Sequence, residues 1–70
     1  MNYTFFGPDI DADAYLNESG CLEKVVIHHP VHPGRYIEIP GDWYDGVPCD
    51  NAAIISAVSQ SLNGAKVHIK

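Results

Sequence analysis

The stretch Asp50-Asn-Ala-Ala-Ile-Ile-Ser-Ala-Val-Ser-Gln-Ser-Leu-Asn63, followed by Gly64, has the pattern of an amphipathic helix. Three apolar residues recur every four positions and share one helical face: Ile54, Val58 and Leu62. Asp50 suits the N-cap because its carboxylate can accept hydrogen bonds from free amides of the first turn. Gly64 suits the C′ position, where many helices end in left-handed backbone. The sequence therefore predicts one main helix over about 50–63.

Working outward from this helix, the remaining chain favours short strands and turns. Strand-forming residues occupy 2–6, 21–29, 35–39 and 65–69, with Pro40 ending the third stretch. The turn residues at 30–34 fit a hairpin, and those at 41–48 fit a loop. Pro8 at one end and Ser19-Gly20 at the other predict a short helix near 9–17. We expect an α+β fold, in which one face of a small four-stranded, mostly antiparallel sheet carries the main helix.

The length of 70 residues predicts a single domain over 1–70. The 46% hydrophobic content argues against disorder. No apolar run approaches the roughly 20 residues of a membrane-spanning helix, so no membrane association is expected. The first residues lack the basic and apolar regions of a signal peptide, so we expect a cytoplasmic protein.

Two cysteines, Cys21 and Cys49, leave two alternatives. In a cytoplasmic protein the expectation is two reduced, partly buried thiols. A disulfide would staple so small a fold, but sequence alone does not show whether the two side chains meet.

The net charge of −5 is unevenly distributed along the chain. Residues 1–23 contain no Lys or Arg but five acids: Asp9, Asp11, Asp13, Glu18 and Glu23. Residues 24–70 contain four acids and four bases, which cancel. This balance argues against direct nucleic-acid binding, which needs a cationic surface. It favours a basic protein surface as the partner.

The segment Asp9-x-Asp11-x-Asp13 has the alternating aspartates that open an EF-hand calcium loop. The sixth position is Ala14 instead of Gly, and the twelfth is Gly20 instead of Glu, so no calcium site is expected. We predict that these carboxylates, together with Tyr15, Glu18 and Glu23, bind sites on a partner that otherwise take phosphates.

Asp42-Trp43-Tyr44-Asp45 is a second candidate partner-binding segment. Trp and Tyr are enriched at interface hot spots, and the flanking carboxylates suit Arg or Lys on a partner. The alternative is that Trp43 folds back to cover the core.

Three histidines, His28, His29 and His32, are the residues that raise the question of a metal. Adjacent strand residues point to opposite faces, so His28 and His29 are poorly placed to chelate together. The hypothesis is therefore no metal and no cofactor, with a small metal-binding or structural accessory domain kept as the alternative. The sequence also lacks a nucleophile elbow and a glycine-rich phosphate loop, so no enzymatic activity is expected.

The predicted outer face of the helix carries no charge, since it consists of Ser56, Ser59, Gln60 and Asn63. Such a face needs little desolvation on docking, which keeps a homodimerising module as a further alternative.

In its small size, its acidic segment (Asp9, Asp11, Asp13, Glu18 and Glu23) and its compact α+β pattern, the chain resembles anti-CRISPR proteins of phages and mobile elements. These proteins share no common motif, so the resemblance assigns no residue roles. It implies a non-enzymatic inhibitor in the host cytoplasm that binds a CRISPR effector complex by imitating the charge of DNA. The leading hypothesis is thus an acidic inhibitor that blocks a basic, nucleic-acid-binding surface of its partner.

Overall fold

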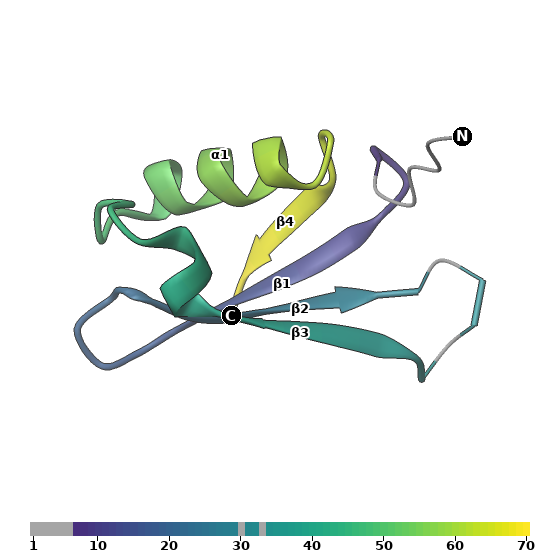
Figure 1. Ribbon diagram of the computed structural model, residues 1–70, viewed down its shortest axis with the longest axis horizontal. Coiled ribbons are helices and arrows are strands. Elements are labelled where there is room, and N and C mark those ends of the chain that lie inside the picture. Colours follow the sequence, from purple (N-terminus) through teal and green to yellow (C-terminus); the bar gives the residue numbers. More distant parts are fainter. Residues whose placement is uncertain (1–6, 30, 33) are drawn as a thin grey trace.

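The computed structural model describes residues 7–29, 31–32 and 34–70, which include every Asp, Glu, Lys and Arg of the chain. The elements follow in the order β1 (Asp11–Leu16), β2 (Leu22–His28), β3 (Tyr36–Pro40), the 3-10 helix η1 (Gly41–Tyr44), α1 (Asn51–Ser61) and β4 (Lys66–Ile69). The strands form one sheet in the order β3-β2-β1-β4 (Figure 1). Only the β1–β4 pair is parallel among the described strands. The predicted α+β class, with a mostly antiparallel sheet and one main helix, is confirmed.

The predicted short helix near 9–17 is wrong, because this segment forms β1. Ala12 and Ala14 are fully buried, whereas Asp11 at the start of the strand is exposed. Burial on every second residue is the period of a strand with one face on the core. The predicted strand at 2–6 lies outside the described residues.

The main helix has the caps that its sequence predicts, with one shift. The amide of Ala53 donates to Asp50 Oδ2 at 3.1 Å, so Asp50 is the N-cap. At the other end the Gly64 amide donates to the Ser59 carbonyl at 2.8 Å, which is the long bond of a Schellman motif. Asn63, with φ of 55°, therefore takes the C′ position that the sequence assigned to Gly64.

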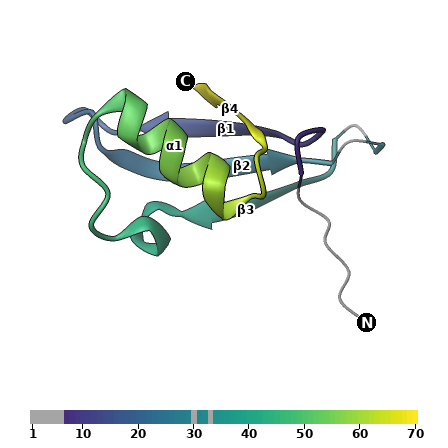
Figure 2. The ribbon, with the colours of Figure 1, turned by 90° about the horizontal axis from the view of Figure 1, so that it is seen from above.

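The core lies between α1 and the inner face of the sheet, which α1 crosses (Figure 2). The helix contributes Ile54, Val58 and Leu62, as predicted, and all three are buried. The residues that they meet come from the turn before β1, from β1 and β2, and from the turn before β4: Ile10, Ala12, Ala14, Val25, Ile27 and Ala65.

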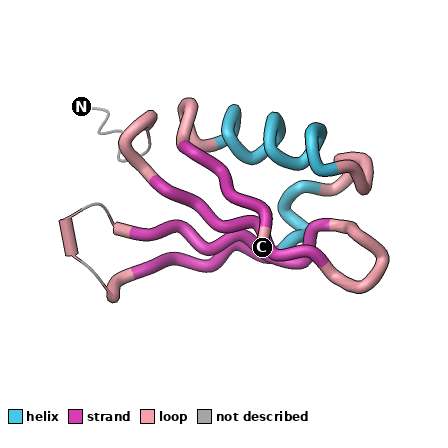
Figure 3. Tube along the Cα trace, turned by 180° about the vertical axis from the view of Figure 1, so that it is seen from behind, coloured by secondary structure: helices cyan, strands magenta, loops and turns pink. Residues whose placement is uncertain are grey.

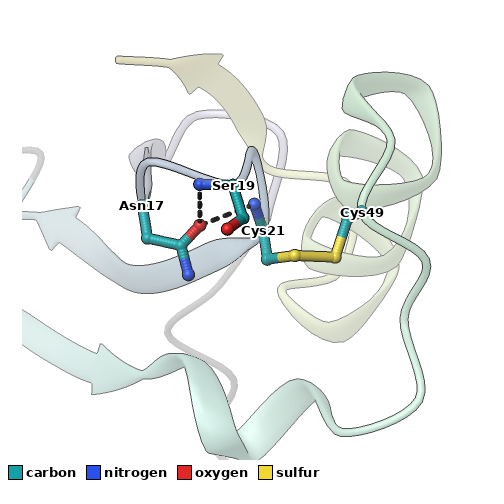
Figure 4. The surroundings of a disulfide bond; sticks show 4 residues. All are labelled: Asn17, Ser19, Cys21 and Cys49. Atoms are coloured by element: carbon teal, nitrogen blue, oxygen red, sulfur yellow. Dashed lines mark hydrogen bonds between the residues drawn. A yellow bond between two sulfur atoms is a disulfide. The ribbon is translucent and has the colours of Figure 1, made fainter.

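Cys21 and Cys49 form a disulfide, so the expectation of two reduced thiols is wrong (Figure 4). The bond joins the β1–β2 turn to the segment before α1, and the two cysteines are 28 positions apart. Asn17 shapes the turn, because its Oδ1 accepts from the amides of Ser19 and Cys21 at 2.9 and 3.0 Å. Closing a loop of this length contributes about 3.5 kcal/mol in the chain-entropy model.

No described helix has the length and apolar character needed to cross a membrane.

Candidate protein-interaction site

Two acids of β1, Asp11 and Asp13, lie on the face of the sheet opposite α1, which we call the outer face. Asp13 Oδ2 lies 2.8 Å from His28 Nε2 on β2, and its Oδ1 lies 3.9 Å from Lys70 Nζ beyond β4. Asp11 Oδ1 lies 3.5 Å from His68 Nε2 on β4. The predicted row of carboxylates therefore sits between two strands that carry basic side chains.

Tyr15, the third β1 residue on the outer face, is also engaged by a base. The ammonium of Lys24 lies 5.2 Å from the centre of the Tyr15 ring, within cation–π range. By strand alternation and register, the outer face holds three acids and three lysines: Asp11, Asp13, Glu38, Lys24, Lys66 and Lys70. It is a mixed-charge surface with no net charge.

The negative charge of the protein lies instead at the end where the disulfide is. Five exposed acids occur in the β1–β2 turn, at the start of β2, in η1 and before α1: Glu18, Glu23, Asp42, Asp45 and Asp50. Asp9 and Arg35 cancel each other in the charge count, so these five acids equal the net charge of −5. We call this group of five the acidic end. Figure 3 shows the β1–β2 turn and the start of α1 at one end of the sheet, away from the β2–β3 hairpin.

Trp43 projects from the acidic end. Its side chain is 75% exposed, so it does not cover the core. Its neighbour Tyr44 packs against the core instead, and the Tyr44 hydroxyl lies 2.7 Å from Ser61 Oγ at the end of α1. A 3-10 turn separates adjacent side chains by about 120°, which turns one aromatic inward and the other outward. Trp43 is thus held on an anchored turn beside Asp42 and Asp45.

Gly41 fixes where this turn sits. A Cβ at Gly41 would overlap the Leu22 carbonyl oxygen and lie 2.8 Å from that of Glu23. Only glycine permits this approach of η1 to the start of β2. The approach holds Asp42 and Trp43 on the same end of the molecule as Glu23.

Of the three candidate metal-binding histidines, only His29 and His32 lie together, with ring centroids 4.7 Å apart. His28 faces Asp13 on the outer face. His29 Nδ1 accepts from the amides of Val31 and His32, each at 3.1 Å, and so shapes the hairpin turn. Within residues 7–29, 31–32 and 34–70, no three His, Cys, Asp or Glu side chains are grouped to hold a metal ion.

On the exposed side of α1, Gln60 Nε2 donates to Ser56 Oγ at 3.3 Å. This face carries no charge, as its sequence predicts, but α1 also exposes an apolar side chain, Ile55, to 37%.

No known protein family, curated protein or solved structure matches this chain. We therefore infer the function of this protein from the arrangement of its own residues. Sequence reasoning named Glu18, Glu23 and the Asp42–Asp45 segment separately but did not join them. The signal that joins them is the pairing of Cys21 with Cys49, because those cysteines flank the two segments.

Proposed function

We propose that this protein is a non-enzymatic interaction protein that binds a basic protein surface through its acidic end. The observation that carries the proposal is that five exposed acids, equal to the net charge of −5, lie at the same end of the molecule as an exposed tryptophan. Carboxylates attract Lys and Arg over several ångströms and set the rate and the specificity of association. A large aromatic on the same surface supplies the apolar contact that hot spots need.

The partner surface that fits this chemistry is one that normally binds nucleic acid. Proteins that bind single strands combine a basic groove for phosphates with apolar or aromatic platforms for bases. The acidic end offers an analogous pair, with carboxylates in place of phosphates and the indole of Trp43 in place of a base. The protein would then act as an inhibitor, in keeping with its resemblance to anti-CRISPR proteins, and the basic surface of a CRISPR effector complex is the partner class that this resemblance suggests.

The experiment compares two triple variants with the same net charge. E18Q/D42N/D45N removes three charges from the acidic end, and D9N/D11N/E38Q removes three exposed charges elsewhere. Trp43 is the only tryptophan in the sequence, so its emission reports directly on this site. The probe is an octa-arginine peptide, titrated at low salt.

We expect octa-arginine to change the Trp43 emission, and the acidic-end variant to bind it roughly fivefold more weakly than the matched control does. Equal binding by the two triple variants would contradict the assigned site. The same pair of variants then tests the function in a capture experiment from host lysate. The wild type and the matched control should displace nucleic acid from the captured protein, and the acidic-end variant should not.

A further inference from the structure

The two edge strands of the sheet present different surfaces. The β4 edge carries Lys66 and ends at Lys70, and lysines on an edge discourage pairing with another chain. The β3 edge carries no lysine, and its residues Tyr36 and Ile37 are 59% and 52% exposed. The β3 edge therefore lacks the lysines of the β4 edge, and the protective residues that it does carry are Glu38 and Pro40.

The register shows which backbone groups the β3 edge offers. The His29 amide donates to the Arg35 carbonyl at 3.0 Å, and His28 lies opposite Tyr36. In an antiparallel pair such bonds recur at every second residue, so Ile37 bonds to β2. The N–H and C=O groups of Tyr36 and Glu38 then point away from β2, toward the side of β3 on which no described strand pairs.

The position of Pro40 is consistent with this orientation of the β3 backbone groups. Pro40 belongs to β3, although the sequence predicts that it ends the strand, and it shares the outward phase of Glu38. A proline is tolerated there because its missing N–H would face the free edge and not the ladder.

A pocket of about 390 Å³ opens beside this edge, at the hairpin end of the sheet. It is lined by Ile27, His29, Gly34, Arg35, Tyr36 and Ile37. Its volume lies in the range of about 300–1,000 Å³ typical of ligand pockets. The exposed half of Ile37 shows that α1 leaves this part of the inner face uncovered.

Arg35 gives the pocket its charge preference. The Arg35 side chain has no ion-pair partner among the described residues, which contain all the acids of the chain. A guanidinium binds a carboxylate through two parallel hydrogen bonds. An acidic group on a ligand would therefore complement this pocket.

We propose that the β3 edge binds an extended peptide segment of a partner, which adds to the sheet as an antiparallel strand. A residue opposite Ile37 places its side chain on the inner face, where an aromatic group fits the pocket. The residue two positions later lies opposite Arg35 on the same face, because strand side chains alternate. The preferred segment thus has an aromatic residue followed two positions later by Asp or Glu. This site lies apart from the acidic end and does not depend on the function proposed for it.

The test measures fluorescence anisotropy of labelled peptides on the full-length protein. The probe is Thr-Phe-Thr-Glu-Thr, and its controls replace the Glu with Gln or Lys. A fourth peptide carries N-methyl groups on the two threonines beside the Phe, which removes the donors to the edge carbonyls. The protein variants are Arg35→Glu and, as a control with the same change in net charge on the opposite edge strand, Lys66→Glu.

We expect the Glu peptide to bind roughly tenfold more tightly than the Lys peptide, and N-methylation to abolish binding. Arg35→Glu should reverse the preference in favour of the Lys peptide, whereas Lys66→Glu should keep the wild-type preference. Equal affinities for the Glu, Gln and Lys peptides would overturn the proposal, as would unchanged binding after N-methylation or no anisotropy change up to about 1 mM peptide. A dimer in light scattering that Glu38→Pro dissociates would instead assign this edge to a second copy of the chain.

Discussion

Asp13 Oδ2 lies 2.8 Å from His28 Nε2, across the β1–β2 ladder on the outer face. The Asp13 side chain is only 14% exposed, and Lys70 approaches its other oxygen. This pairing makes Asp13 a structural acid, although in the sequence it belongs to a run without any base. Among the described residues, the acids without an ion-pair partner are Asp9, Glu38 and the five of the acidic end.

Asp13→Asn should therefore lower the free energy of unfolding by about 1 kcal/mol at neutral pH, because a mostly buried carboxylate loses charge-assisted contacts. Asp11→Asn is the control, since Asp11 is 58% exposed and its contact to His68 is 3.5 Å long. Its effect should stay within about 0.5 kcal/mol. Urea unfolding followed by far-UV circular dichroism measures both, and equal losses would contradict a structural role specific to Asp13.

Reduction of the Cys21–Cys49 disulfide should destabilise the protein by about 3.5 kcal/mol, since the unfolded chain regains the entropy of a closed loop. The measurement is urea unfolding with and without dithiothreitol. The variant C21S/C49S should match the reduced wild type and should not respond to dithiothreitol. A wild type equally stable in both buffers would show that the bond does not constrain the unfolded chain.

Gly41→Ala should cost about 2 kcal/mol or more, because the new methyl group overlaps backbone carbonyls that belong to β2. Gly7→Ala is the matched control, since a Cβ there meets nothing within 4 Å. Thermal unfolding should show a clear drop in Tm for the first variant and little change for the second. A neutral Gly41→Ala would mean that η1 does not need its close approach to β2.

The two adjacent aromatics of η1 should separate stability from binding. Trp43→Ala should leave the unfolding free energy within about 0.5 kcal/mol, because the side chain is mostly exposed, but should weaken capture of a basic partner. Tyr44→Phe should cost about 1 kcal/mol through the lost contact to Ser61 and should leave the surface charge unchanged. A large stability loss in Trp43→Ala would return Trp43 to the core and contradict its role in binding.

The main helix could be predicted from the sequence because its apolar spacing and its N-cap are local signals. β1 could not, because aspartate disfavours strands and Pro8 suggested a helix start. The alternation of aspartate with alanine is the strand signal, but alanine is too small to mark a core face until a helix is seen to pack on it. Tertiary packing on Ala12 and Ala14 overrode the local preference.

The candidate site could not be predicted in full, because it depends on contacts between residues that are far apart in the sequence. The acids of β1 seemed unopposed because two of their contact partners, His68 and Lys70, come at the end of the chain. Those residues reach β1 only through the parallel β1–β4 pair. Likewise, Glu18 and Asp45 are far apart in sequence, and the Cys21–Cys49 bond joins the segments that carry them.

The same covalent bond has a consequence for cleavage of the backbone. The β2–β3 hairpin lies between Cys21 and Cys49, so a protease that cuts at its exposed tip, near Val31, releases nothing. One fragment would keep β1 and β2, and the other would keep β3, α1 and β4. The disulfide and the sheet would hold the two fragments together, with the acidic end intact and assembled from both.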